Sequence, residues 1–186
     1  RLADYAGQVR AWLVPLPRPR VLVGASLGGL LAAMNADAAD ALVLVNPMPP
    51  AGLPGTPARP AVVPWGHRAS LAGTRRALPG ADDAAALLAF RRWRDESGAV
   101  LDEAAAGLAL PPPRIPVLVI GSEADTDVPI EASRTLAATW SARFRPVPGG
   151  HVDPLLGRAA APLATQTLSW LHQEMGSEHI NVSNTV

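Results

Sequence analysis

The sequence contains no cysteine and no lysine. Without cysteine, the chain cannot form disulfides, bind metals through thiolates or use a cysteine nucleophile. Its 16 basic residues, all arginine, are balanced by 16 acidic ones. A net charge of zero argues against binding to nucleic-acid phosphates or anionic lipids. No run of about 18 apolar residues is present, so no membrane-spanning segment is predicted. With 186 residues, 48% of them apolar, the composition is typical of one globular domain.

Three short, continuously apolar runs predict buried parallel strands. They fall at residues 21–23, 41–45 and 117–120. Continuous rather than alternating apolar residues are typical of strands that helices cover on both faces. A weaker run at 142–145 predicts a fourth strand, and helical patterns lie between and after the runs. We therefore expect an α/β fold with about four parallel strands flanked by helices.

Prolines mark the borders of a long insertion between the second and third strands. They crowd the first third of residues 48–113, and three consecutive prolines close it. Residues 84–93 predict a helix within it. The expected organisation is an elbow-side core (1–47), a proline-rich cap or lid insertion (48–113), a carboxyl-terminal core (114–175) and a flexible tail (176–186). Insertions of this kind often carry substrate specificity.

The segment Gly24-Ala25-Ser26-Leu27-Gly28 follows the first strand and opens a helix. A sharp strand-to-helix turn of this kind exposes a serine at the carboxyl end of the sheet. Gly24 and Gly28 lack Cβ atoms, so the neighbouring backbone can approach closely. Ser26 then lies at a helix N-terminus, where the backbone N–H of Leu27 can donate to a developing oxyanion. Ser26 is the candidate nucleophile.

A serine hydroxyl needs a base, and four histidines compete for that role. His151 follows a Gly-Gly turn after the fourth strand, at the sheet end where Ser26 is expected. His67, His172 and His179 lie in the insertion, the last helix and the tail, and we interpret them as structural or exposed. His151 is the candidate base. Because a base must be neutral, we expect activity to fall below about pH 6 to 7.

The base in turn needs an orienting carboxylate. Asp125 follows the third strand and is the candidate acid. Asp127, two residues on, is the alternative acid, although its place before the next helix favours a capping role. We interpret Glu123 and Asp153 as solvated charges. No metal-ligand spacing is seen, and the chemistry requires neither a cofactor nor a metal.

These motifs, in the order Ser, Asp, His, resemble the carboxyl-terminal part of an α/β-hydrolase. The resemblance covers about residues 1–175 and rests on the elbow at 23–29, the acid turn at 121–129 and the histidine turn at 149–151. It implies that Ser26 is the nucleophile, His151 the general base and then acid, and Asp125 the carboxylate that orients the imidazole. It also implies hydrolysis of a small ester, thioester or related acyl substrate through an acyl-enzyme, with carbon–carbon cleavage or perhydrolysis left open.

The resemblance also implies strands before the elbow strand and a loop there that supplies a second oxyanion amide. Only about twenty residues precede the first strand here. We therefore expect that an amino-terminal segment is missing or that a second chain completes the sheet. The alternative function is a catalytically silent truncated fragment or an interaction module without a complete oxyanion hole. No signal peptide is seen, so we expect a cytoplasmic protein, although a targeting signal would lie in a missing segment.

Overall fold

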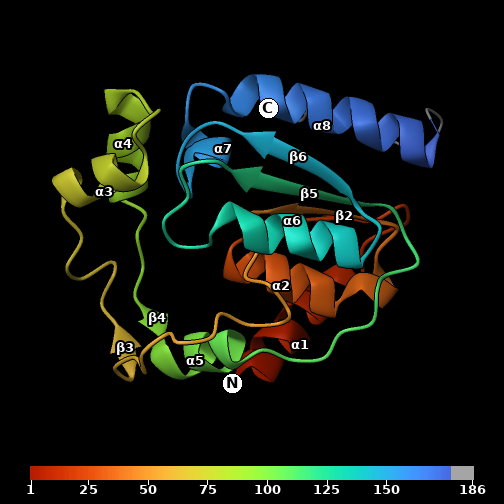
Figure 1. Cartoon of the computed structure of the whole chain (residues 1–186), viewed down its shortest axis with the longest axis horizontal. Helices are drawn as coiled ribbons and strands as arrows, with labels where there is room; N and C mark the ends of the chain where they lie inside the picture. Colours follow the sequence, from red (N-terminus) through yellow and green to blue (C-terminus); the bar gives the residue numbers. More distant parts are fainter. Residues whose placement is uncertain (177–186) are drawn as a thin grey trace.

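A four-stranded parallel sheet forms the centre of the computed structural model, which describes residues 1–176 (Figure 1). Its strands are β1 (Val21–Ala25), β2 (Ala41–Val45), β5 (Val117–Ser122) and β6 (Arg143–Val147). They lie in the order β1-β2-β5-β6, and all three neighbouring pairs are parallel. The predicted α/β fold with four parallel strands flanked by helices is confirmed.

Helices cover both faces of the sheet (Figure 1). On one face, α2 (Leu27–Met34) and α6 (Ile130–Thr139) pack against Leu44 and other apolar residues of β2 and β5. On the other face, α8 (Ala160–Met175) contributes Trp170 and its neighbours. Every residue of β2 and β5 is consequently buried. This two-sided burial explains why their sequences are apolar without alternation.

Strand β1 lies at one edge of the sheet. Within residues 1–176 it pairs with β2 alone. Val23, at its middle, is 63% exposed. The backbone groups on the open side of β1 can therefore accept a further strand.

Helix α1 (Leu2–Leu13) ends just before prolines at positions 15, 17 and 19, which cannot continue a helix. It packs on α2 and on α5 (Gly98–Ala106), and the shared core cluster includes Leu30 and Val100. A 3₁₀ turn, η1 (Ala36–Ala38), follows α2. Because α5 belongs to residues 48–113, part of the insertion packs directly into the core.

The insertion contains more regular structure than the one helix predicted at 84–93. Besides α5 it forms β3 (Val62–Val63), α3 (Leu71–Ala77), α4 (Asp83–Phe90) and β4 (Glu96–Ser97), with β3 and β4 antiparallel. In Figure 1, α3 and α4 stand at one end of the molecule, near the short helix α7 (Asp153–Leu156).

Two expectations concern the chain as a whole. Among the helices of the described part, none is long and apolar enough to cross a membrane. The predicted flexible tail, residues 176–186, lies outside the described residues except for Gly176.

Candidate active site

The three candidate residues of the sequence analysis all lie at the carboxyl edge of the sheet. Ser26 directly follows β1, Asp125 comes three residues after β5, and His151 comes four residues after β6. Because the four strands are parallel, their carboxyl ends meet at one edge. In open parallel sheets this edge is where ligands bind.

Ser26 occupies a strained turn between β1 and α2. Its φ of 52° and ψ of −123° lie in a region that residues other than glycine seldom adopt. Two backbone hydrogen bonds hold it there: Ser26 N–H donates to the carbonyl of Val45 at 3.0 Å, and the Ser26 carbonyl accepts the N–H of Met48 at 2.9 Å. Strain of this kind persists only where the surroundings enforce it, and it is common at functional sites.

Glycines make room for this turn, but not at both predicted positions. A Cβ at Gly24 would lie 2.2 Å from the carbonyl oxygen of Gly28, so no side chain fits there. At Gly28 itself nothing lies within 4 Å of such an atom, so the close approach of the two residues depends on the missing side chain of Gly24 and not on that of Gly28. The second close approach is instead at Gly29, where a Cβ would lie 2.7 Å from Cβ of Pro47.

The backbone N–H of Leu27 is the first of helix α2. The first N–H groups of a helix have no acceptor within the helix. The N–H of Leu27 donates no hydrogen bond to any other group within residues 1–176. This donor, next to Ser26, can therefore bind an oxygen that becomes negative during a reaction.

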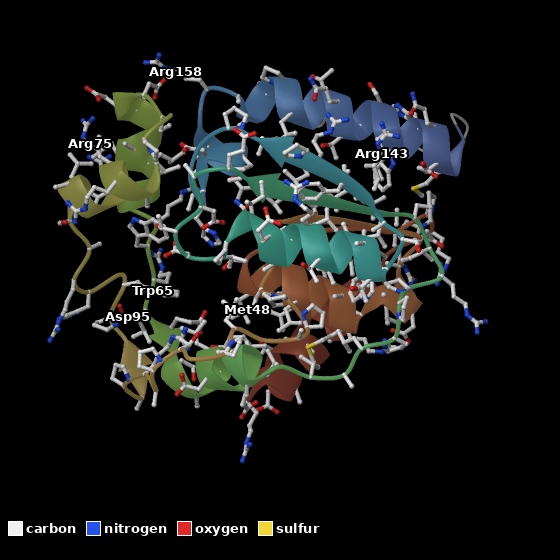
Figure 2. The ribbon with its side chains drawn as sticks, viewed as in Figure 1. Met48, Trp65, Arg75, Asp95, Arg143 and Arg158 are labelled. Carbon is white, nitrogen blue, oxygen red and sulfur yellow. The ribbon has the colours of Figure 1, made fainter. Side chains whose placement is uncertain are left out.

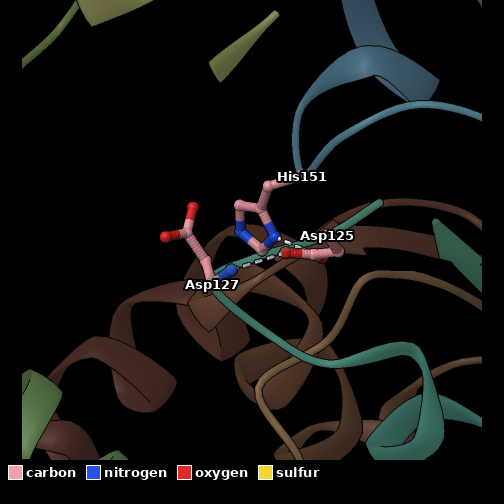
Figure 3. Close-up of side chains that lie close together, drawn as sticks. All are labelled: Asp125, Asp127 and His151. Atoms are coloured by element: carbon pink, nitrogen blue, oxygen red, sulfur yellow. Dashed lines mark hydrogen bonds and ion pairs between the residues drawn. The ribbon is translucent and has the colours of Figure 1, made fainter. Parts of the chain in front are cut away.

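His151 and Asp125 form a hydrogen-bonded pair (Figure 3). Nδ1 of His151 lies 2.7 Å from Oδ2 of Asp125. The Asp125 side chain is completely buried, and that of His151 is 14% exposed. With Nδ1–H donating to the carboxylate, a neutral imidazole carries its lone pair on Nε2. Nε2 is thus available to accept a proton.

The other oxygen of the Asp125 carboxylate is also fully engaged. Oδ1 accepts the backbone N–H groups of Asp127 at 2.8 Å and Val128 at 2.9 Å. These two bonds fix the orientation of the carboxylate toward His151. The Asp127 side chain, by contrast, does not cap α6, which begins after Pro129 without a side-chain cap. The predicted capping role of Asp127 is therefore wrong.

The pKa of His151 is shifted by competing effects. Burial penalises the charged imidazolium and lowers the pKa, but the hydrogen bond to Asp125, its negative charge and the charge of Asp127 together outweigh burial. The net result is a pKa above the ordinary value for histidine. A base of raised pKa accepts a proton more readily but must be deprotonated at a higher pH before it can act.

Ser26 and His151 lie at the same carboxyl edge of the sheet, but no hydrogen bond joins their side chains. Among residues 1–176, no hydrogen bond joins the Ser26 hydroxyl to the imidazole. Catalytic hydrogen bonds are often long in a free enzyme and tighten when substrate binds.

Asn46, which is not among the residues predicted from the sequence, connects the His151 turn to Ser122 at the end of β5. It follows β2, is 1% exposed and has a positive φ of 43°. Its Nδ2 donates to the carbonyl of His151 at 2.7 Å and to Oγ of Ser122 at 2.8 Å, while its Oδ1 accepts the N–H of Ser122 at 2.7 Å. The only sequence signal was an asparagine at a strand end, a residue type that tolerates positive φ.

Asp153 also differs from the sequence-based interpretation. It was expected to be solvated, but it is 4% exposed. Its carboxylate accepts the backbone N–H of Gly150 at 2.6 Å and that of Gly80 at 3.0 Å. The expectation is therefore wrong, because two backbone donors replace water around this carboxylate.

Within residues 1–176, Asp125, Asp127 and His151 form a group that could hold a metal ion. One ligand atom from each lies within 4.8 Å of the others. However, both oxygens of Asp125 and Nδ1 of His151 are already engaged in hydrogen bonds. The arrangement is that of a carboxylate orienting an imidazole.

The remaining candidates lie elsewhere. His67 is exposed in the insertion, where its backbone N–H bonds Asp95 at 2.8 Å. Asp95 and the half-exposed Trp65 lie in the same part of the insertion (Figure 2). Trp93 donates from Nε1 to Oγ1 of Thr74 at 2.8 Å, a contact within the insertion. His179 lies outside the described residues.

A family model described as the alpha/beta hydrolase family matches residues 1–166 of this chain. A comparison with curated proteins finds no match.

Several solved structures have the same fold. A serine hydrolase involved in carbazole degradation is 18% identical with a TM-score of 0.65, and the match covers 93% of this chain and 72% of that one. The monoacylglycerol lipase of Paleococcus ferrophilus is 18% identical with a TM-score of 0.63, covering 93% and 76%. A methylesterase from Arabidopsis is 12% identical with a TM-score of 0.65, covering 91% and 77%. At these identities the likeness concerns the fold alone.

Proposed function

The chain belongs to the alpha/beta hydrolase family, as the resemblance in its sequence predicts, and we propose that it is a serine hydrolase. The proposed substrate is a small ester, thioester or related acyl compound. The observation that carries the proposal is the 2.7 Å bond between His151 Nδ1 and Asp125 Oδ2, at the sheet edge that also bears the strained turn of Ser26. A nucleophile, a base and an orienting acid are the minimum set for acyl transfer by serine.

In the proposed first step, Oγ of Ser26 attacks the substrate carbonyl and His151 takes the hydroxyl proton at Nε2. Asp125 keeps the imidazole in the tautomer with the proton on Nδ1 and stabilises the imidazolium that forms. His151 then donates its new proton to the leaving group. The products of this step are an acyl-enzyme on Ser26 and a free alcohol or thiol.

In the second step, water attacks the acyl carbon while His151 removes its proton. Collapse of the intermediate releases the carboxylic acid and returns the proton to Ser26. During both steps the carbonyl oxygen becomes negative, and the N–H of Leu27 is the proposed donor to it. Removing one such donor typically slows an enzyme by about 100- to 1000-fold.

The structural neighbours favour an acyl substrate. Two of them are named as a lipase and a methylesterase, and a third as a serine hydrolase. We extend ester cleavage to this chain as a proposal, since fold alone does not set the substrate.

The open edge of β1 favours a second candidate. An exposed Val23 in a strand with one edge unpaired within residues 1–176 is a feature of strands that pair with another chain. In this alternative, the protein is catalytically silent and acts as an interaction module, with a second chain or a further segment completing the sheet.

Turnover of p-nitrophenyl esters by the purified chain separates the two candidates. We expect hydrolysis by the wild type and a loss of about 10⁶-fold in kcat in Ser26→Ala, because the nucleophile is removed. Ser169→Ala is the matched control, since Ser169 is exposed on α8 and its hydroxyl bonds only the helix backbone. A folded wild type without activity favours the interaction module, and an active Ser26→Ala variant rejects the nucleophile assignment.

A further inference from the structure

The turn that carries His151 is held by three contacts from outside its own strand. The carbonyl of Gly149 accepts the N–H of Ala124 at 3.0 Å, which ties the turn to the loop of Asp125. The carbonyl of His151 accepts Nδ2 of Asn46 at 2.7 Å. The N–H of Gly150 donates to Oδ2 of Asp153 at 2.6 Å. The third contact is the only one of these three made by a charged group.

The Asp153 side chain packs directly against this turn. Gly149 has a φ of 99°, and a Cβ there would lie 2.6 Å from Oδ2 and 2.7 Å from Cβ of Asp153. No side chain fits between the turn and this residue, so the two are in direct contact. Bonds from backbone N–H groups to a carboxylate are stronger than neutral hydrogen bonds, and burial strengthens them further.

The same carboxylate reaches the insertion. Its Oδ1 accepts the N–H of Gly80, which lies between α3 and α4, at 3.0 Å. A second bond reinforces the connection: the N–H of Arg158 donates to the carbonyl of Gly80 at 3.1 Å. Helix α4 also contacts α7, and Arg158 lies at this end of the molecule beside the insertion (Figure 2).

We propose that Asp153 is a positioning residue that fixes the His151 turn for catalysis and couples it to the insertion through Gly80. This inference rests on the proposed function and adds to it a residue outside the Ser26, His151 and Asp125 set. Its two oxygens each hold one backbone donor, one on the turn and one on the insertion. Because one carboxylate holds both donors, a displacement of Gly80 in the insertion would shift the turn that carries the base.

The expected effect follows from how strictly proton transfer depends on geometry. A displacement of about 1 Å at a catalytic group can cost on the order of 100-fold in rate. An asparagine at position 153 has one acceptor oxygen instead of two, and its NH₂ group would face a backbone N–H. One of the two contacts is then lost, while the bond between His151 and Asp125 remains chemically possible.

The test compares Asp153→Asn and Gly80→Ala with the wild-type chain. We expect Asp153→Asn to lower kcat by about 10- to 100-fold with KM changed less than about twofold. Gly80→Ala is gentler, since its Cβ would lie 3.1 Å from Oδ1 of Asp153, and we expect a smaller loss in the same direction. The matched control is Asp102→Asn, because Asp102 also accepts a backbone N–H within the insertion, from Arg59 at 3.2 Å, but has no contact with the histidine turn.

A second readout needs no turnover. The Nδ1–H proton of His151 has a strongly deshielded NMR resonance when it is hydrogen-bonded to a carboxylate. We expect this resonance to move upfield in Asp153→Asn and Gly80→Ala, and to stay in place in Asp102→Asn. If Asp153→Asn fails to fold, the kcat and the His151 resonance of Gly80→Ala test the proposal instead.

The outcomes separate this proposal from the proposed function. An inactive wild type whose His151 resonance shifts on Gly80→Ala rejects the hydrolase and supports the positioning role. A folded variant at Asp153 with wild-type kcat and an unmoved resonance overturns the positioning role. A lower kcat with an unmoved resonance also overturns it, because Asp153 would then act other than through His151.

Discussion

Different kinds of interaction stabilise the sheet and the insertion. In the sheet, β2 and β5 are buried along their whole length by apolar residues of α2, α6 and α8. In the insertion, α5 shares the apolar core, whereas polar side chains also hold the backbone of the loops and of α3 and α4. Asp95 accepts the N–H groups of Gly66 and His67 at 2.9 and 2.8 Å, and Ser70 and Asp82 cap α3 and α4.

A substitution in the sheet should therefore have wider structural consequences than one in the insertion. Apolar burial is cooperative and extends through the sheet, whereas a cap or a loop carboxylate stabilises a few neighbouring residues. The candidate site lies where the two regions meet, because its histidine turn contacts both Asn46 of the sheet and, through Asp153, Gly80 of the insertion.

The largest expected contrast is between two aspartates that each accept backbone N–H groups. In Asp125→Asn, the amide no longer fixes the imidazole tautomer, and we expect kcat for ester hydrolysis to fall by about 10⁴-fold. In Asp95→Asn, on the insertion, we expect kcat to stay within about twofold. Steady-state kinetics of both variants measures the contrast. Equal losses would mean that the loop carboxylates share one structural role.

A stability contrast comes next. Leu44 in β2 is completely buried, and Leu44→Ala should lower the free energy of unfolding by about 2–5 kcal/mol, because it removes apolar contacts and leaves a cavity. Leu88 in α4 of the insertion is 46% exposed, and Leu88→Ala should cost less than about 1 kcal/mol. Chemical denaturation of the two variants provides both values. A larger loss at Leu88 would show that the insertion, and not the sheet, limits stability.

The smallest expected effect is a shift in pH dependence. The pKa of His151 is raised above its ordinary value, partly by the charge of Asp127. Since only the neutral imidazole accepts a proton, kcat/KM should rise with pH to a plateau, with a midpoint above about pH 6.5. Asp127→Asn removes a negative charge that favours the imidazolium, so the midpoint should move to lower pH.

The control for this shift is Glu123→Gln, which removes an exposed charge from the same loop but does not contribute to the pKa of His151. The profile of kcat/KM against pH should be unchanged in this variant. A midpoint that moves equally in both variants would show that net charge, and not the position of Asp127, sets the pKa of His151.

Much of the sheet could be predicted because its sequence is locally distinctive. The runs at 41–45 and 117–120 are apolar throughout, which is typical of strands buried on both faces. The turn of Ser26 could be predicted for a similar reason, since its glycines and serine are close together in the sequence between a strand and a helix.

The insertion and the supporting contacts of the site could not be predicted in this way. Strands β3 and β4 have two residues each, too few for a periodic pattern. Asp153 bonds Gly80, 73 positions away, and Asn46 bonds His151, 105 positions away. Nothing in the neighbouring sequence shows that a donor as distant as Gly80 will bind the Asp153 carboxylate. The sequence therefore predicts a solvated charge at Asp153.

The central claim is that the hydroxyl following β1 is made nucleophilic by the imidazole following β6. The most direct measurement is the intact mass of the chain after treatment with a fluorophosphonate, followed by identification of the labelled peptide. We predict one phosphonyl group on Ser26 in the wild type, and none in Ser26→Ala or His151→Gln. Labelling of Ser26 that persists at the wild-type rate in folded His151→Gln would contradict the claim.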